Sequence, residues 1–329
     1  MHALTFHGGR LDEAARRYPH APLPWIDLST GINPLPWHGQ APPVDLHALP
    51  SPAALDALAR AAAGAFGAPE IALTALPGSE IGLRLLACLD LPRPFHLVAP
   101  GYRSHQSALP GATVVRIDTI ADLARHGGTL LLANPNNPDG RLLAPEHLRS
   151  LARTLAAQGG LLIVDEAFAD AVDGASILPL LTPQDRVLVL RSFGKFYGLA
   201  GVRLGFACGA ADLVARIAEL LGSWPVSATA LALGTAAYRD GAWQARTRAT
   251  LIATAARLDR LLAAHGLAPH GDCPLFRLIE SEGAASRFER LAHAGILTRP
   301  FDYAPDWLRI GLPADDAAFA RLDAALGHG

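Results

Sequence analysis

The sequence predicts an α/β protein in which a large, mostly parallel sheet domain is followed by a smaller α+β domain. Up to about residue 225, short apolar runs alternate with helical patterns, as they do in parallel sheets covered by helices. After Pro225 the pattern changes to a long alanine- and arginine-rich helix. A chain of 329 residues is long for one core, so two domains are expected.

The N-terminal residues 1–50 are expected to form an extended arm, because the prolines in 19–50 leave no room for a regular helix. Ser51 and Pro52 suit the N-cap and first position of a helix that runs to about Phe66. Buried strands are expected at Ile71–Ala75, Phe95–Ala99, Ala112–Ile117, Thr129–Ala133, Leu161–Val164, Val187–Leu190 and Leu204–Ala207, and helices near 79–89, 144–158 and 210–221. Residues 51–225 form the expected large domain.

The small domain is expected at 226–329. It begins with one long helix over roughly 226–265, and strand, helix and strand signals follow near 274–279, 285–294 and 305–310. No internal repeat interrupts this order.

Composition narrows the functional classes. The net charge is −2 and no basic stripe appears, so neither nucleic acid nor a membrane surface is an expected partner. No window reaches the roughly 18 apolar residues of a membrane span, and the N-terminus has no secretory pattern. Three widely spaced cysteines predict buried free thiols in a reducing compartment, and the histidines lack metal-ligand spacing. A cytoplasmic protein without a metal site is expected.

Residues 192–205, Ser-Phe-Gly-Lys-Phe-Tyr-Gly-Leu-Ala-Gly-Val-Arg-Leu-Gly, are the most informative stretch. Such a loop can place the amine of Lys195, the hydroxyl of Ser192 and the guanidinium of Arg203 around one anionic cofactor. The stretch resembles the Schiff-base loop of fold-type-I pyridoxal-phosphate enzymes, the aspartate aminotransferase superfamily. The resemblance implies that Lys195 holds pyridoxal 5′-phosphate as an imine, while Ser192 and Arg203 bind its phosphate. The alternative is a solvated surface lysine.

Two further turns match the superfamily. Pro-Gly-Ser-Glu at 77–80 stands between a strand and a helix, where backbone N–H groups can bind an anion. The resemblance implies that Gly78, Ser79 and Glu80 hold the cofactor phosphate, although a plain helix cap explains the turn about as well. Asn-Pro-Asn-Asn-Pro-Asp-Gly at 134–140 resembles the N-P-x-N-P-x-G loop, in which the residue matching Asn137 hydrogen-bonds the pyridoxal O3′ and borders the substrate.

The cofactor ring has its own candidates. Asp165, in Asp-Glu-Ala-Phe after an apolar strand, matches the carboxylate that pairs with the pyridine nitrogen and keeps the ring protonated. Phe168 stands where many relatives place a tyrosine, so one hydrogen bond to O3′ is expected to be missing. Tyr102 matches an aromatic residue that stacks on the ring, although simple core packing would also explain it.

The subunit contact is also inferred from the resemblance. Relatives act as dimers with active sites at the interface, so a homodimer is expected. Many carry a tyrosine-proline pair whose hydroxyl reaches the cofactor phosphate of the neighbouring subunit. The corresponding place here is Leu49-Pro50, which lacks that hydroxyl and leaves this contact unassigned.

The N-terminus suggests the substrate. His-Gly-Gly at 7–9 and Asp-Leu-Ser-Thr-Gly-Ile-Asn-Pro at 27–34 resemble the opening of L-threonine-O-3-phosphate decarboxylases of cobalamin biosynthesis, which are close to histidinol-phosphate aminotransferases. The resemblance implies that His7, Ser29, Asn33 and Arg299 bind the substrate phosphate. Arg309, near the C-terminus, matches the arginine that pairs with the substrate α-carboxylate. A phosphorylated amino acid is therefore the expected small-molecule partner.

The expected reaction is decarboxylation of L-threonine O-3-phosphate to (R)-1-aminopropan-2-yl phosphate, with Lys195 and Asp165 as the catalytic residues. Lys195, as a free amine, would protonate Cα after CO2 departs. The cofactor residues are common to other reactions, so histidinol-phosphate transamination is the alternative. A non-catalytic protein with the same fold is a further one, although related regulators add a helix-turn-helix segment that this chain lacks.

Overall fold

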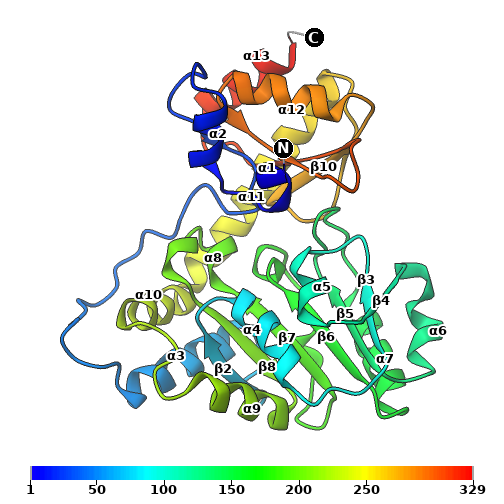
Figure 1. Ribbon diagram of the computed structural model, residues 1–329. Helices are drawn as coiled ribbons and strands as arrows, with labels where there is room; N and C mark the ends of the chain where they lie inside the picture. The colour runs from blue at the N-terminus through cyan, green and yellow to red at the C-terminus, as the bar shows by residue number, and fades with distance from the viewer. Residues whose placement is uncertain (1, 328–329) are drawn as a thin grey trace. The chain divides into compact units, whose positions relative to one another are not determined.

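The structure is a computed structural model that describes residues 2–327. The chain forms two compact units (Figure 1). The sheet unit comprises Pro36–Asn137 and Arg141–Arg246, and the terminal unit comprises Met1–Leu35, Pro138–Gly140 and Thr247–Gly329. The division therefore groups residues 36–50 and 226–246 with the large sheet, whereas the sequence-based domain boundaries lie at 50 and 225.

The sheet unit is built on seven strands in the order β2-β8-β7-β6-β5-β3-β4. They are β2 (Ala72–Leu76), β3 (Phe95–Val98), β4 (Thr113–Val115), β5 (Thr129–Ala133), β6 (Leu161–Glu166), β7 (Val187–Ser192) and β8 (Gly205–Gly209). All neighbouring pairs are parallel except those of β8, which is antiparallel to both β2 and β7. This large sheet with its covering helices confirms the predicted α/β fold.

Helices precede, separate and follow these strands along the chain. They are α3 (Pro52–Ala65), α4 (Ser79–Leu85), α5 (Ser104–Ala108), α6 (Ile120–Ala124), α7 (Pro145–Ala156), α8 (Phe193–Phe196), α9 (Ala211–Leu221) and α10 (Ala228–Arg239), with short 3₁₀ turns η1 (Leu86–Cys88), η2 (Ile117–Thr119), η3 (Ala169–Ala171), η4 (Leu178–Leu180) and η5 (Ala200–Val202). Ser51 caps α3 by accepting a hydrogen bond from the backbone N–H of Ala54, and Pro52 follows at the first position, as predicted.

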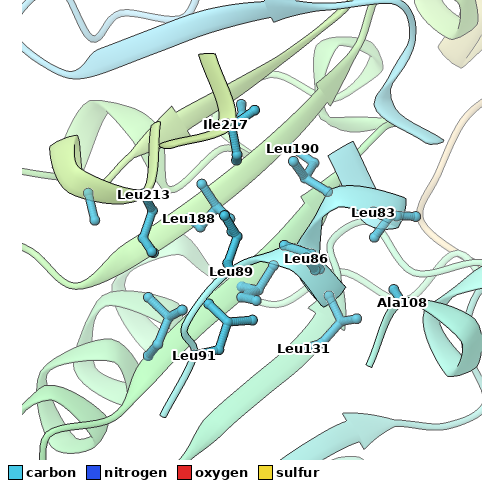
Figure 2. Packing of buried hydrophobic residues seen from close by; sticks show 14 of the residues in the cluster. Leu83, Leu86, Leu89, Leu91, Ala108, Leu131, Leu188, Leu190, Leu213 and Ile217 are labelled. Atoms are coloured by element: carbon cyan, nitrogen blue, oxygen red, sulfur yellow. The ribbon is translucent and has the colours of Figure 1, made fainter. Parts of the chain in front are cut away.

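One face of the sheet carries a continuous apolar layer. Figure 2 shows leucines of α4 and η1 packed with Leu131 of β5, Leu188 and Leu190 of β7, and residues of α9. Ile163 of β6 belongs to the same layer. Because side chains alternate along a strand, Asp165 and Ser192 point to this face, each two residues beyond an apolar member of the layer.

The opposite face of the sheet is covered by α3 and α10, which pack against each other. Phe66, directly after α3, meets the rings of Phe206 on β8 and Tyr238 on α10 at 5.6 and 5.3 Å. These contacts place residues 228–239 with the sheet, although they follow Pro225.

The terminal unit contains a four-stranded antiparallel sheet in the order β12-β13-β10-β9 and a parallel pair, β1-β11. Its strands are β1 (Ile26–Asp27), β9 (Pro269–His270), β10 (Phe276–Glu280), β11 (Ile296–Leu297), β12 (Arg299–Pro300) and β13 (Trp307–Gly311). Its helices are α1 (His2–Phe6), α2 (Leu11–Arg17), α12 (Ala284–His293) and α13 (Asp316–Gly327). The N-terminal residues thus begin with two short helices and contribute a strand, beyond the extended arm that was expected.

The prediction of one long helix over 226–265 is wrong. The structure has two helices there, α10 and α11 (Gly241–Ala264), which are separated at Asp240. Oδ1 of Asp240 accepts a hydrogen bond from the backbone N–H of Trp243 at 3.0 Å, so Asp240 caps the start of a new helix.

Two other predictions concern the burial of the cysteine thiols and the presence of a membrane-spanning helix. Cys208 and Cys273 are buried free thiols, but Cys88 is exposed at the end of η1, which corrects the expectation for that residue. No helix within residues 2–327 is long and apolar enough to cross a membrane.

Candidate active site

Lys195 lies on the single turn of α8, directly after β7, and its side chain is half-buried. Its Nζ is 5.9 Å from the centre of the Phe168 ring. The turn is tightly closed, because a Cβ atom on Gly194 would lie 2.7 Å from Cα of Ala200. The local backbone therefore holds the only side-chain amine of the chain at the end of the sheet.

Three predicted phosphate ligands converge beside this turn. The backbone of Gly78, at φ 89° and ψ 147°, lies so close to Arg203 that a Cβ there would be 2.5 Å from Nη2. Ser192 pairs with Gly205 across β7 and β8, and a Cβ on Gly205 would lie 2.6 Å from the backbone nitrogen of Ser79. Ser192, Arg203 and the start of α4 thus lie close together. A hydroxyl, a guanidinium and helix N–H groups are donors that can bind a phosphate.

Glu80 has a different surrounding from that predicted for a phosphate ligand. Its Oε1 accepts a hydrogen bond from Nε of Arg84 at 3.1 Å, one helical turn further along α4. A carboxylate would repel a phosphate. We therefore expect Glu80 to contribute to phosphate binding only through its backbone N–H.

Asp165 is buried at the end of β6, and its carboxylate is oriented by two donors. Nε2 of His105 lies 2.9 Å from Oδ2, and the backbone N–H of Ala167 donates to Oδ1 at 3.1 Å. His105 itself is 1% exposed on α5. The sequence did not identify His105, although its place three residues after Tyr102 on a short helix carries it to the same side of the sheet.

The loop after β5 is held by two buried asparagines. Asn134 donates to the carbonyls of Leu143 and Ala175 and accepts from the N–H of Leu143 at 2.8 Å, so it fixes both sides of the loop. Asn136 donates to the carbonyl of Pro100 at 2.9 Å. This bond ties the loop that bears Asn137 to the turn that bears the predicted stacking residue.

Tyr102, that stacking residue, meets the His105 ring edge-on at 5.7 Å. Burial raises the pKa of its hydroxyl to about 12, and the negative charges of Glu80 and Asp165 add to the effect. The raised pKa reflects how deeply the phenol is buried beside the carboxylates of Glu80 and Asp165.

The predicted substrate ligands gather in the terminal unit. Oγ of Ser29 accepts a hydrogen bond from the N–H of Gly9 at 2.8 Å and donates to Oδ1 of Asp27 at 2.5 Å. Gly8 lies against the same residue, since a Cβ there would be 2.3 Å from the carbonyl oxygen of Ser29. These contacts of Ser29 with Gly8 and Gly9 fix the backbone next to His7. Asp27, which orients the hydroxyl, was not identified from the sequence.

Two buried arginines face each other across strands β12 and β13. Arg299 and Arg309 are directly paired, and they are 7% and 5% exposed. Nη2 of Arg309 donates to the carbonyl of Ser29 at 2.8 Å, and Nη2 of Arg299 donates to that of Phe6 at 2.6 Å. Burial lowers the pKa of Arg309 to about 10, and the charge of Arg299 lowers it further in the same direction. Paired buried cations of this kind suit a substrate with anionic groups.

Asn33 completes the predicted substrate set. It is 2% exposed, and its Oδ1 accepts a hydrogen bond from the N–H of Leu35 at 2.9 Å. The predicted residues thus form two groups, with the cofactor ligands in the sheet unit and the proposed phosphate and carboxylate ligands in the terminal unit. In the part of the chain that the structure describes, no group of three His, Cys, Asp or Glu side chains could hold a metal ion.

Comparisons with known proteins identify the family of the chain. The model of the family "Aminotransferase class I and II" matches residues 46–322. A threonine-phosphate decarboxylase of Sinorhizobium sp. is 41% identical and covers 100% of this chain and 99% of its own. Another, from Pseudomonas aeruginosa, is also 41% identical and covers 97% and 96%.

Among solved structures, a histidinol-phosphate aminotransferase from Sinorhizobium meliloti in complex with pyridoxal-5′-phosphate has a TM-score of 0.77 at 21% identity. It covers 96% of this chain and 92% of its own. That likeness concerns the fold. Together with the family match and the full-length relatives, it shows that this chain belongs to the aminotransferase class I and II family.

Proposed function

We propose that the chain is a pyridoxal-phosphate-dependent decarboxylase that converts L-threonine O-3-phosphate to (R)-1-aminopropan-2-yl phosphate and CO2 in cobalamin biosynthesis. The observation that carries the proposal is the identity of 41% to two threonine-phosphate decarboxylases along essentially the whole chain. The buried Arg299–Arg309 pair supports it, because this substrate carries both a carboxylate and a phosphate.

The residues of the sheet unit fit the cofactor. Lys195 supplies the amine that bonds it, Arg203 and Ser192 flank the space for its phosphate, and Asp165 offers a carboxylate to the ring nitrogen. Tyr102 and Asn137 are the proposed contacts to the ring face and to O3′. When bound, pyridoxal phosphate withdraws electrons from the bonds at the substrate Cα.

The protein's own groups then decide the reaction. Arg309 binds the α-carboxylate, whereas Arg299, His7, Ser29 and Asn33 bind the phosphate. Holding both ends of the substrate sets the rotation about Cα, and this rotation selects the bond to the carboxylate for cleavage. His105 keeps the Asp165 carboxylate in place through the 2.9 Å contact. After CO2 leaves, the protonated amine of Lys195 would donate a proton to Cα in place of the lost carboxylate.

The alternative is a transaminase such as histidinol-phosphate aminotransferase, whose substrate also carries a phosphate. The histidinol-phosphate aminotransferase of similar fold supports it more weakly, at 21% identity. A non-catalytic binding protein is the remaining alternative. It would have to keep Lys195, Arg203, Asp165 and the buried arginine pair without using them.

We also propose a cytoplasmic homodimer. Support comes from the surface near the expected cross-subunit contact, where Leu46 and Leu49 are 78% and 68% exposed. Residues 42–51 there border an apolar groove of about 460 Å³ against α3 and α10. Sedimentation of the purified protein tests this part, and a monomer would refute it.

The deciding experiment measures CO2 release from L-threonine O-3-phosphate without any 2-oxoglutarate. We expect release by the wild type, none by Lys195→Ala, and a raised KM for His7→Ala. His20→Ala, an exposed histidine of the same unit, is the matched control and should behave as the wild type. Glutamate-dependent transamination of histidinol phosphate without CO2 release would refute the proposed reaction. Visible imine absorbance that persists in Lys195→Ala, without an added amine, would refute the cofactor assignment.

A further inference from the structure

Lys195 is chemically unique in this chain. Of the 28 basic Lys and Arg side chains, 27 are arginines and Lys195 is the single lysine. No other lysine can therefore replace its amine or obscure its titration.

The amine of Lys195 lies over the ring of Phe168. The ring centre is 5.9 Å from Nζ, within the range of a cation–π interaction, and the ring is 5% exposed. Phe168 stands three residues after Asp165 and precedes the short turn η3. Phenylalanine has no hydroxyl group, so Phe168 can interact with the amine only through its aromatic ring.

A buried ion-pair network fastens this turn to the sheet. Arg191 on β7 donates through Nη2 to Asp170 of η3 and through Nη1 to Glu166 at 2.8 Å. Glu166 also accepts bonds from Ser176 at 2.5 Å and from the N–H of Ile177 at 2.8 Å. The three charged side chains are 7% exposed or less.

The network lies behind the cofactor residues. Glu166 and Arg191 are paired across β6 and β7, and each is adjacent in sequence to a cofactor residue on the opposite face of the sheet. Asp170 is two residues after Phe168, and the N–H of Ala171 donates to the carbonyl of Phe168 at 3.1 Å. Arg191 therefore fixes the backbone from which the Phe168 ring projects.

We propose that the face of Phe168 stabilises the protonated amine of Lys195, and that the Asp170–Arg191 ion pair is the positioning device that keeps the ring there. The proposal rests on the proposed function, in which Lys195 becomes a free amine and must carry a proton to Cα. An aromatic face attracts an ammonium group and has little interaction with a neutral amine, so it favours the proton-carrying form.

Other groups also set the charge of Lys195. The charged and titratable side chains on the neighbouring segments are Asp165 of β6, Tyr102 before α5, Glu80 of α4 and Arg203 after η5, together with His105. The buried ion pairs of Arg191 with Asp170 and Glu166 lie on the same segments. All these charges stay unchanged in the two Phe168 variants below, whereas Asp170→Asn removes one negative charge. Differences between the Phe168 variants therefore report the ring.

The test is a titration of Lys195 in the full-length protein after release of the cofactor. Reductive methylation with ¹³C-formaldehyde labels only Lys195 and the N-terminal amine, so NMR can follow a single lysine signal. We expect Phe168→Leu to lower the measured pKa of this amine by about 0.5 to 1.5 units. Phe168→Tyr keeps the aromatic face and should stay within about 0.3 unit of the wild type.

The tether is tested with Asp170→Asn, which should lower the same pKa in the wild type but add little to the shift of Phe168→Leu, because a direct effect of the lost charge would persist without the ring. A further shift of the same size in the double variant would overturn the tether. Phe319→Leu, a buried phenylalanine on α13, is the control for lost packing and should leave the titration unchanged. Thermal unfolding shows that each variant is folded. In the holoenzyme, the basic limb of the kcat profile should move down in pH with Phe168→Leu.

Equal titration of wild type and Phe168→Leu would overturn the cation–π role, and an unshifted Asp170→Asn would overturn the tether. The titration does not depend on the substrate. Its failure is therefore distinct from a failure of CO2 release, which would instead overturn the proposed reaction.

Discussion

Replacing Gly78 by alanine tests the proposed phosphate-binding residues where the backbone of Gly78 lies against the Arg203 guanidinium. The backbone angles of Gly78, φ 89° and ψ 147°, lie in a region that is essentially reserved for glycine. We expect Gly78→Ala to lower the free energy of unfolding by about 1–3 kcal/mol through this strain alone. The added Cβ would also lie 2.5 Å from Nη2 and 3.2 Å from Cζ of Arg203, so the guanidinium must move.

The displaced guanidinium determines the effect on cofactor affinity. A hydrogen bond to a charged group contributes about 1.5–3 kcal/mol, which corresponds to a factor of roughly 10 to 150 in a dissociation constant. We expect this loss in Gly78→Ala when the cofactor-free protein is titrated with pyridoxal phosphate and followed by absorbance. Urea unfolding of the cofactor-free protein measures the strain separately.

Two variants complete the experiment. Gly201→Ala is the matched control, because this glycine of the same loop has open space around its position and no positive φ, so affinity should stay within about twofold. Arg203→Met removes the guanidinium without straining the backbone. If the affinity loss acts through Arg203, Gly78→Ala should add little to Arg203→Met. Full affinity in Gly78→Ala, or fully additive losses, would refute the reasoning.

Three further predictions concern other parts of the chain. Ser29→Ala removes the acceptor for the Gly9 N–H, so KM for threonine phosphate should rise about tenfold while the cofactor spectrum stays unchanged. Tyr238 has a buried hydroxyl without a hydrogen-bond partner within residues 2–327, so Tyr238→Phe should leave the Tm unchanged or raise it. Since the pKa of Arg309 is lowered to about 10, KM should rise as the pH increases through 10. Over the same range the folded chain releases this proton before the unfolded chain does, so this group's contribution to stability increases, which urea titrations at pH 9 to 11 can measure.

Much of the sheet could be predicted because its strands are continuous apolar runs. Thr129–Ala133 is an example, since all its residues are buried and four of the five are apolar. The ends of β6 and β7 could not be read in this way. These strands continue through Glu166 and Arg191. In the sequence, two charged residues at these positions indicate a loop. In the fold they are buried strand residues that form an ion pair with each other.

The site shows the same limit. Lys195, Arg203 and Asp165 stand in local motifs with recognisable spacing. His105 does not, because its functional meaning depends on a carboxylate 60 residues away that only the folded sheet brings within 2.9 Å. The packing of α3 against α10 is likewise a long-range contact, which hydrophobic periodicity cannot reveal.

The facing arginines of β12 and β13 have a consequence for the protein without its substrate. Like charges at directly opposed strand positions destabilise a sheet, and here both are withdrawn from water. A dianion that bridges them would remove that repulsion and bind only the folded form, so it would act as a folding ligand as well as a reactant. The unliganded chain is then the form most exposed to unfolding and proteolysis, which couples the lifetime of the protein to the supply of its phosphorylated substrate.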